Sequence, residues 1–126
     1  MAKECINLPG VTGRPYSQAV RAGDFIFVSG TVGNVDLETG EKRVGLQAQT
    51  KQCLETIKKV LARSGATLED IIKCTVFITK MDDFAAMNEI YRTYFTKDLP
   101  SRSTIVCGLV APDMVIEIEC VAYKAR

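Results

Sequence analysis

The sequence contains no histidine and no tryptophan. Without histidine there is no Ser-His-Asp or Cys-His nucleophile system, no histidine-bound metal, and the commonest general base is missing. Any acid–base chemistry would then depend on carboxylates, tyrosine, lysine or water. The formal net charge is only +1, which argues against nucleic acid or an acidic membrane surface as a partner.

Long apolar runs and paired cysteines are also missing. No run approaches the length of a membrane span, and residues 1–5 form no signal-peptide apolar region, so we expect a cytoplasmic protein with no membrane partner. The five cysteines are widely separated and form no C-x-x-C pair. A structural zinc site or a disulfide framework is therefore not expected, and most of these thiols fit apolar patterns as small core residues.

The length of 126 residues fits one domain, residues 1–126, with a single core. Apolar residues alternate in some segments and recur at helical spacing in others, which predicts two strands and an optional third, then helix, strand, helix and two strands. The expected elements are a hairpin at 17–30 with its turn at Gly23, a helix at 44–64 ended by Gly65, a strand at 71–79, a helix at 84–95 capped by Asp82 or Asp83, and strands at 102–109 and 114–123.

This order is typical of an α+β fold in which two helices cover one face of a mostly antiparallel or mixed sheet. The alternation in the strand at 71–79 assigns Ile72 and Cys74 to one face and Phe77 to the other. The face that the helices leave uncovered mixes apolar and charged side chains. We expect it to pack against other subunits, with the charged positions lining pockets between them.

Arg102 and Glu117 are the charged residues that most need an explanation, because each lies within an apolar strand. The alternation of both strands assigns them to the uncovered face. One interpretation is a cross-strand ion pair. The other is a binding site, in which a guanidinium binds a substrate carboxylate and a carboxylate handles water or a proton.

Three further residues have both a structural and a functional interpretation. Tyr16 follows Pro15 in a turn-rich loop and is either a pocket wall or a loop anchor. Ser29 ends a strong strand and either donates a hydrogen bond into a cleft or simply ends the strand. Asn88, on the second helix, is a surface residue or a cleft residue.

Taken together, five segments resemble the RidA family, also called YjgF. They are Pro15–Val20, Val28–Gly30, Asn88–Tyr91, Pro100–Ser103 and Ile116–Glu119. The similarity runs essentially end to end at matching spacing. Its most specific part is a Pro-x-Arg-Ser segment followed by a glutamate in an Ile-Glu-Ile-Glu strand.

The resemblance implies a chorismate-mutase-like fold and a homotrimer whose sheets form an inner barrel, with three active sites in clefts between subunits. It implies hydrolysis of reactive enamine and imine acids, such as 2-aminoacrylate and 2-iminobutanoate, to 2-keto acids and ammonia without a cofactor or metal. The alternatives are a non-catalytic regulatory trimer that binds a small carboxylic acid and, less favoured, an RNA-cleaving or translation-inhibiting protein.

The resemblance also implies a role for each site residue. Arg102 would clamp the substrate carboxylate, Glu117 would position or activate the attacking water, and Tyr16 would close the pocket. The remaining positions expected around the substrate are Ser29, Gly30, Asn88 and Thr104.

Two positions depart from the family pattern. Thr104 stands where many deaminases have a cysteine; its backbone carbonyl can still contact the substrate, but the pocket thiol is gone. Arg14 stands where a glycine usually precedes Pro-Tyr-Ser. This second cation either attracts anionic substrates to the pocket mouth or is a solvated loop charge.

Overall fold

A computed structural model describes residues 2–126, and its six strands and two helices follow the predicted α+β order. The first strand, β1, was not assigned individually from the sequence. The elements are β1 (Glu4–Ile6), β2 (Ala19–Ala22), β3 (Phe25–Val32), α1 (Leu46–Ala62), β4 (Ile71–Ile78), α2 (Phe84–Tyr94), β5 (Ser101–Val106) and β6 (Ile116–Tyr123).

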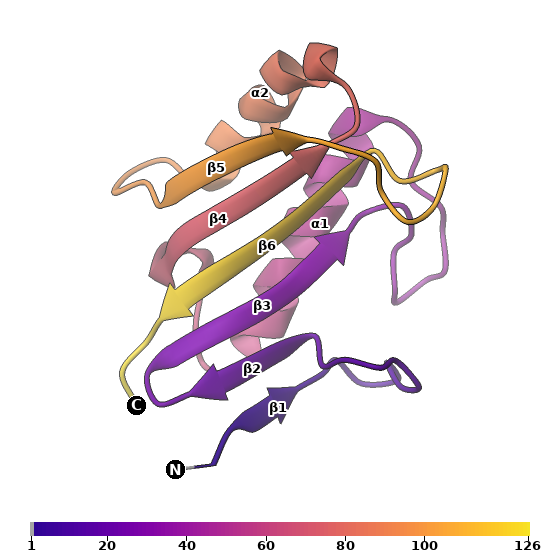
Figure 1. Cartoon of the computed structure of the whole chain (residues 1–126). Helices are drawn as coiled ribbons and strands as arrows, with labels where there is room; N and C mark the ends of the chain where they lie inside the picture. The colour runs from indigo at the N-terminus through magenta and orange to yellow at the C-terminus, as the bar shows by residue number, and fades with distance from the viewer. Residues whose placement is uncertain (1) are drawn as a thin grey trace.

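The six strands form one mixed sheet in the order β1-β2-β3-β6-β4-β5. The last strand, β6, lies between β3 and β4 and is antiparallel to both, whereas β4 and β5 are parallel. Both helices lie behind the sheet in Figure 1, so one face is covered and the other is open. The predicted layering of two helices on one side of the sheet is confirmed.

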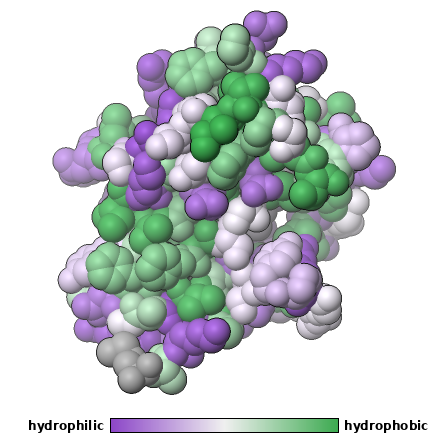
Figure 2. Space-filling model, viewed as in Figure 1, coloured by the Kyte–Doolittle hydropathy of each residue, from purple (hydrophilic) through white to green (hydrophobic). Residues whose placement is uncertain are grey.

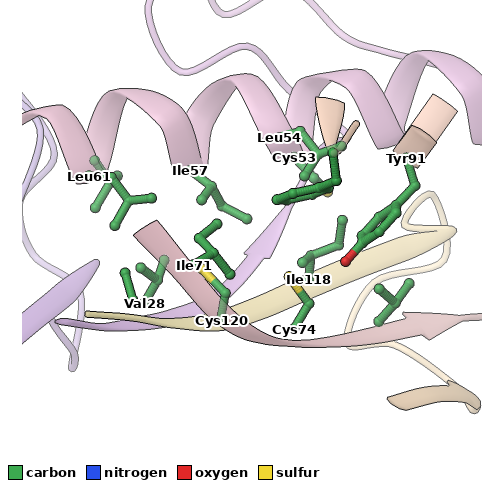
Figure 3. Packing of buried hydrophobic residues seen from close by; sticks show 14 of the residues in the cluster. Val28, Cys53, Leu54, Ile57, Leu61, Ile71, Cys74, Tyr91, Ile118 and Cys120 are labelled. Carbon is green, nitrogen blue, oxygen red and sulfur yellow. The ribbon is translucent and has the colours of Figure 1, made fainter. Parts of the chain in front are cut away.

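The core lies between α1, α2 and the covered face of the sheet (Figure 3). On β6, alternate residues from Ile116 to Ala122 are buried, as the period of two requires. On α1, Leu54, Ile57 and Leu61 are fully buried at helical spacing. Truncating one such side chain to alanine typically costs about 2–5 kcal/mol, so this layer accounts for much of the stability.

The C-terminal end of α1 and the N-terminal end of α2 were both predicted from single residues. Gly65 follows α1 with a φ of 73°, and the N–H of Ala66 donates to the carbonyl of Leu61, which confirms Gly65 as the stop signal. Asp83 occupies the N-cap position of α2, as predicted, but neither it nor Asp82 makes a side-chain capping hydrogen bond. A short 3₁₀ turn over Met81–Asp83 leads into α2 instead.

One strand face was assigned incorrectly. The pairing of β4 with β6 is irregular between Ile71 and Lys73. Ile71 is therefore buried, and Ile72 is exposed rather than in the core. From Cys74 onward the strand returns to the predicted alternation, because a single irregularity changes the face of the residues on only one side of it.

The open face of the sheet carries a cluster of exposed aromatic rings. Phe25 and Tyr123 meet edge to face with ring centroids 5.2 Å apart, and Phe27 lies 6.3 Å from Phe25. Figure 2 shows this face, on which apolar and polar residues are interspersed. All three rings are more than two-fifths exposed, which is unusual for large aromatic residues on a sheet surface.

Arg21 ties the hairpin to two distant parts of the chain. It is only 4% exposed, yet no carboxylate pairs with it among the described residues. Its guanidinium donates to the carbonyls of Gly23, Ser64 and Lys124 and to the Ser64 hydroxyl. These bonds join β2, the end of α1 and the segment after β6.

Candidate functional site

A cleft of about 420 Å³ lies beside the second half of β3. The hairpin partner β2 pairs with β3 only as far as Val28, which leaves the rest of β3 to be flanked by loops. The volume falls within the range of small-molecule sites. The cleft is lined by Arg14, Tyr16, Gln18, Ser29, Gly30, Thr31, Val32, Asn34, Val35, Leu37, Thr56 and Met114.

Three predicted site residues, Tyr16, Ser29 and Gly30, therefore meet in this cleft. The Ser29 hydroxyl donates to the carbonyl of Ser17 at 2.7 Å, and its N–H donates to the carbonyl of Gln18 at 2.9 Å. Ser29 thus fastens the Tyr16 loop to β3. With its hydrogen used there, the hydroxyl can accept a hydrogen bond from a ligand, but it does not donate into the cleft as the functional interpretation of Ser29 had proposed.

Glu117 lies directly against Gly30. Its carboxylate occupies the space that a side chain at position 30 would fill, with Cδ only 2.9 Å from the place of a Cβ. Burial raises the pKa of the Glu117 carboxyl, and the neighbouring charge of Glu119 raises it further. A carboxyl with a raised pKa is a stronger base when ionised, which suits proton transfer.

Arg102 is on the covered face of the sheet, not on the open face that its strand pattern predicted. It lies opposite Cys74 of β4, which is fully buried beneath the helices. Glu117 belongs to the opposite set of β6 residues, so the two side chains leave the sheet on different faces. The interpretation of Arg102 and Glu117 as a cross-strand ion pair is therefore wrong, and residues 2–126 contain no salt bridge between them.

The Arg102 guanidinium rests on aromatic rings of α2. It lies 4.7 Å from the ring centroid of Tyr91 and 5.7 Å from that of Phe84, and Nη1 is 3.9 Å from the sulfur of Met87. Contacts of this kind hold a cation without consuming most of its N–H donors. Within the described chain no carboxylate neutralises Arg102, so the donors remain available for an anionic ligand.

These α2 residues were recognised from the sequence as an apolar helix face but not as partners of Arg102. Their spacing of three and four residues places Phe84, Met87 and Tyr91 on one side of the helix. Tyr91 is 7% exposed, and its hydroxyl has no hydrogen-bond partner among residues 2–126. Figure 3 shows this hydroxyl pointing from α2 toward the sheet. The signal that sequence reasoning missed is the pairing of this aromatic helix face with Arg102 on the strand that follows α2.

The predicted site residues fall into two groups within one chain. The β3 group consists of Tyr16, Ser29, Gly30 and Glu117, and the β5 group consists of Arg102 and Thr104 on β5 with Asn88 on α2. Strands β3 and β5 are separated by β6 and β4. At roughly 4.8 Å per strand spacing, β3 lies about 14 Å from β5, and β6, which carries Glu117, lies about 10 Å from it. The side chains of Glu117 and Arg102 also leave opposite faces of the sheet, so one small ligand cannot contact both groups of the same chain.

The three buried cysteines are poor candidates for a nucleophile in either group. Cys53, Cys74 and Cys120 are buried, and burial raises the pKa of each thiol. In residues 2–126, no three His, Cys, Asp or Glu side chains gather closely enough to hold a metal ion. None of the helices described is long and apolar enough to cross a membrane.

The fold and the cleft define a class of protein: a small α+β domain with a cleft of small-molecule size beside an inner strand, β3, of a mixed sheet. The family model described as Endoribonuclease L-PSP matches residues 8–124. RidA from an Antarctic Psychrobacter species is 34% identical, with a TM-score of 0.87 over 95% of this chain and 98% of its own. The chain therefore belongs to the RidA/YjgF family.

Other similar proteins have varied names. A RutC family protein of Pyrococcus abyssi is 44% identical and covers 98% of this chain and 99% of its own. TdcF of Escherichia coli, in a structure with bound serine, is 35% identical with a TM-score of 0.87 over 97% of this chain and 99% of its own. A Schizosaccharomyces pombe relative is named as mitochondrial, so the cytoplasmic location stays a prediction.

Proposed function

We propose that the protein hydrolyses 2-imino acids, and the enamines that tautomerise to them, to 2-keto acids and ammonia. The observation that carries this proposal is the carboxylate of Glu117 held against Gly30, a residue that lines the cleft, together with an arginine whose donors no carboxylate occupies. The binding of serine by the similar protein TdcF supports an amino-acid-sized ligand.

The reaction needs water and one proton carrier. Ionised Glu117 takes a proton from water as the oxygen attacks C2 of the protonated imine, and the electrons of the C=N bond move to nitrogen, giving a neutral carbinolamine. Glu117 then gives this proton to the amino nitrogen of the carbinolamine. The C–N bond breaks, ammonia leaves, and a C=O bond forms as the hydroxyl proton passes back to Glu117 and from there to the departing ammonia as ammonium. Arg102 holds the substrate carboxylate bidentately throughout.

The complete site requires two copies of the chain in this proposal. The β5 group of one subunit would complete the β3 group of its neighbour, because within one chain the two groups are separated by at least two strand spacings and their key side chains, Glu117 and Arg102, leave opposite faces of the sheet. The exposed rings of Phe25, Phe27 and Tyr123 supply an apolar face for subunit packing. A homotrimer with inter-subunit sites fits this arrangement, and light scattering after gel filtration would measure its mass.

The deciding experiment generates 2-iminobutanoate in situ with an amino-acid oxidase and follows its loss by semicarbazide trapping. Wild type should accelerate imine loss, and Arg102→Ala and Glu117→Gln should each reduce the acceleration at least 100-fold. Mixing these two inactive variants during refolding should restore activity, because some sites then combine an intact Arg102 with an intact Glu117.

Two results would contradict the proposal. If wild type binds 2-oxobutanoate in calorimetry but hydrolyses no imine, the protein is a carboxylate-binding regulator without turnover. If wild type is active but mixed variants stay inactive, the site is not shared between subunits in the way described. An alanine variant at the exposed residue Lys58 of α1 provides the control for handling and refolding.

A further inference from the structure

The cleft beside β3 has one charged lining residue, Arg14, within an otherwise neutral wall. In a single chain the cleft measures about 420 Å³, more than the two side-chain carbons of 2-iminobutanoate occupy. A longer side chain can therefore extend toward Arg14, whose positive charge favours an anionic group on that side chain.

Arg14 is held at this position by its neighbours. Its guanidinium carbon lies 5.9 Å from the ring centroid of Tyr16, which itself lines the cleft. Pro15 restricts the backbone of Arg14 to an extended conformation, and Gly13 turns the preceding chain with a φ of 78°. The backbone of the loop thus directs the exposed Arg14 side chain toward the Tyr16 ring and the mouth of the cleft.

Arg14 also lacks an internal counter-ion. In the part of the chain that the structure describes, no Asp or Glu carboxylate forms a salt bridge with it. Elsewhere, the loop arginine Arg43 is neutralised by both Asp36 and Glu41. An unpaired guanidinium over an aromatic ring at the wall of a cleft is a typical receptor for a carboxylate.

We infer that Arg14 selects 2-imino acids that carry a second carboxylate on the side chain, such as 2-iminosuccinate and 2-iminoglutarate. This inference rests on the proposed deamination. Arg102 of a neighbouring subunit binds the carboxylate beside the imine, and Arg14 binds the distal one. The bond changes at C2 are those given above, and the products are a 2-keto dicarboxylic acid and ammonia.

The test compares kcat/KM for 2-iminoglutarate and 2-iminobutanoate, each generated in situ by an amino-acid oxidase and trapped with semicarbazide. Wild type should prefer 2-iminoglutarate, and Arg14→Gln should lower the ratio of the two values about tenfold through KM, while Arg14→Lys keeps most of it. Raising the salt concentration from 50 to 500 mM should reduce the preference in wild type only. Arg63→Gln, which removes an exposed arginine at the far end of α1, should change nothing.

The outcomes separate this inference from the proposed function. If wild type hydrolyses both imines with the same ratio as Arg14→Gln, Arg14 is a solvated loop charge and only the inference is refuted. If wild type hydrolyses neither imine, the proposed function is refuted and the inference with it. A second readout is independent of turnover: in calorimetry, Arg14→Gln should weaken 2-oxoglutarate binding about tenfold and leave 2-oxobutanoate binding unchanged, and equal effects on both would overturn the assignment.

Discussion

Replacing Gly30 with alanine tests whether the contact between Gly30 and Glu117 positions the catalytic carboxylate. The added Cβ would lie 2.9 Å from Cδ of Glu117, whereas ordinary contacts begin at about 3.4 Å. The Cδ must therefore shift by about half an ångström, and the carboxylate oxygen, which the methyl group would overlap, must shift further. A displacement near 1 Å at a reacting group costs on the order of 100-fold in rate.

The fold should tolerate this substitution. The neighbour that must move is the end of a flexible side chain rather than backbone, and alanine in a compatible conformation lowers the entropy of the unfolded chain. We expect the free energy of unfolding to stay within about 1 kcal/mol of wild type, as measured by urea denaturation. Gly108→Ala is the matched control, because a Cβ there meets nothing within 4 Å.

The assay is imine loss with semicarbazide trapping, and the expected change is in kcat. A double-variant cycle tests whether alanine at position 30 acts through Glu117. If it does, Gly30→Ala combined with Glu117→Gln should be no slower than Glu117→Gln alone. Wild-type kcat in a folded Gly30→Ala protein would refute the positioning argument. So would a further 100-fold loss in the double variant, since alanine would then be obstructing the substrate itself.

The other predictions concern charge and packing at and around the site. Glu117 must be ionised to act, and its pKa is raised above 4.5, so activity should be lost on acidification at a higher pH than for an ordinary glutamate. Glu119→Gln should move the acidic limb of the kcat/KM profile to lower pH. An unmoved limb would contradict the effect of the Glu119 charge on the pKa of Glu117. The same raised pKa means that the folded state binds this proton more tightly than the unfolded state, so Glu117→Gln should raise the melting temperature at pH 7, with the difference vanishing below pH about 4.5. Tyr91→Leu removes a ring worth roughly 0.5–2 kcal/mol to the Arg102 cation and should raise KM about two- to thirtyfold, whereas Tyr91→Phe should leave KM unchanged. Equal KM values for both variants would exclude the ring as a support. Arg21→Met leaves buried carbonyls without donors and should cost about 3 kcal/mol or more of unfolding free energy in urea, while a cost below 1 kcal/mol would mean that water replaces the guanidinium.

The sequence predicted well those elements whose signals are local. The hairpin turn at Gly23, the stop at Gly65 and the alternation in β6 each depend on the backbone or on the nearest neighbours, and each is confirmed. The face of β5 was not predictable in this way. Both of its alternating sets contain apolar residues, so the pattern alone does not say which set the short helix α2 covers.

The site residues also divide into those that local structure places and those that tertiary contacts place. Tyr16, Ser29 and Gly30 belong to the first kind, because all three lie in or next to the β2–β3 hairpin, and they line one cleft as predicted. Arg102 was misplaced because the alternation of its strand was interpreted as placing it on the uncovered face. The rings of α2 make that face favourable for a guanidinium, and this compensation depends on a tertiary contact that periodicity does not reveal.

The central position of β6 has a consequence for how the chain assembles. Of the described strands, β6 is the last in sequence but occupies the middle of the sheet. Until it has been synthesised and inserted, β3 and β4 each present an unpaired edge, and the hairpin half has no sheet connection to the β4–β5 half. Such edges pair readily with other chains. A nascent or truncated chain that ends before Ile116 should therefore aggregate or bind a chaperone, and the sheet should form cooperatively only after synthesis has passed Tyr123.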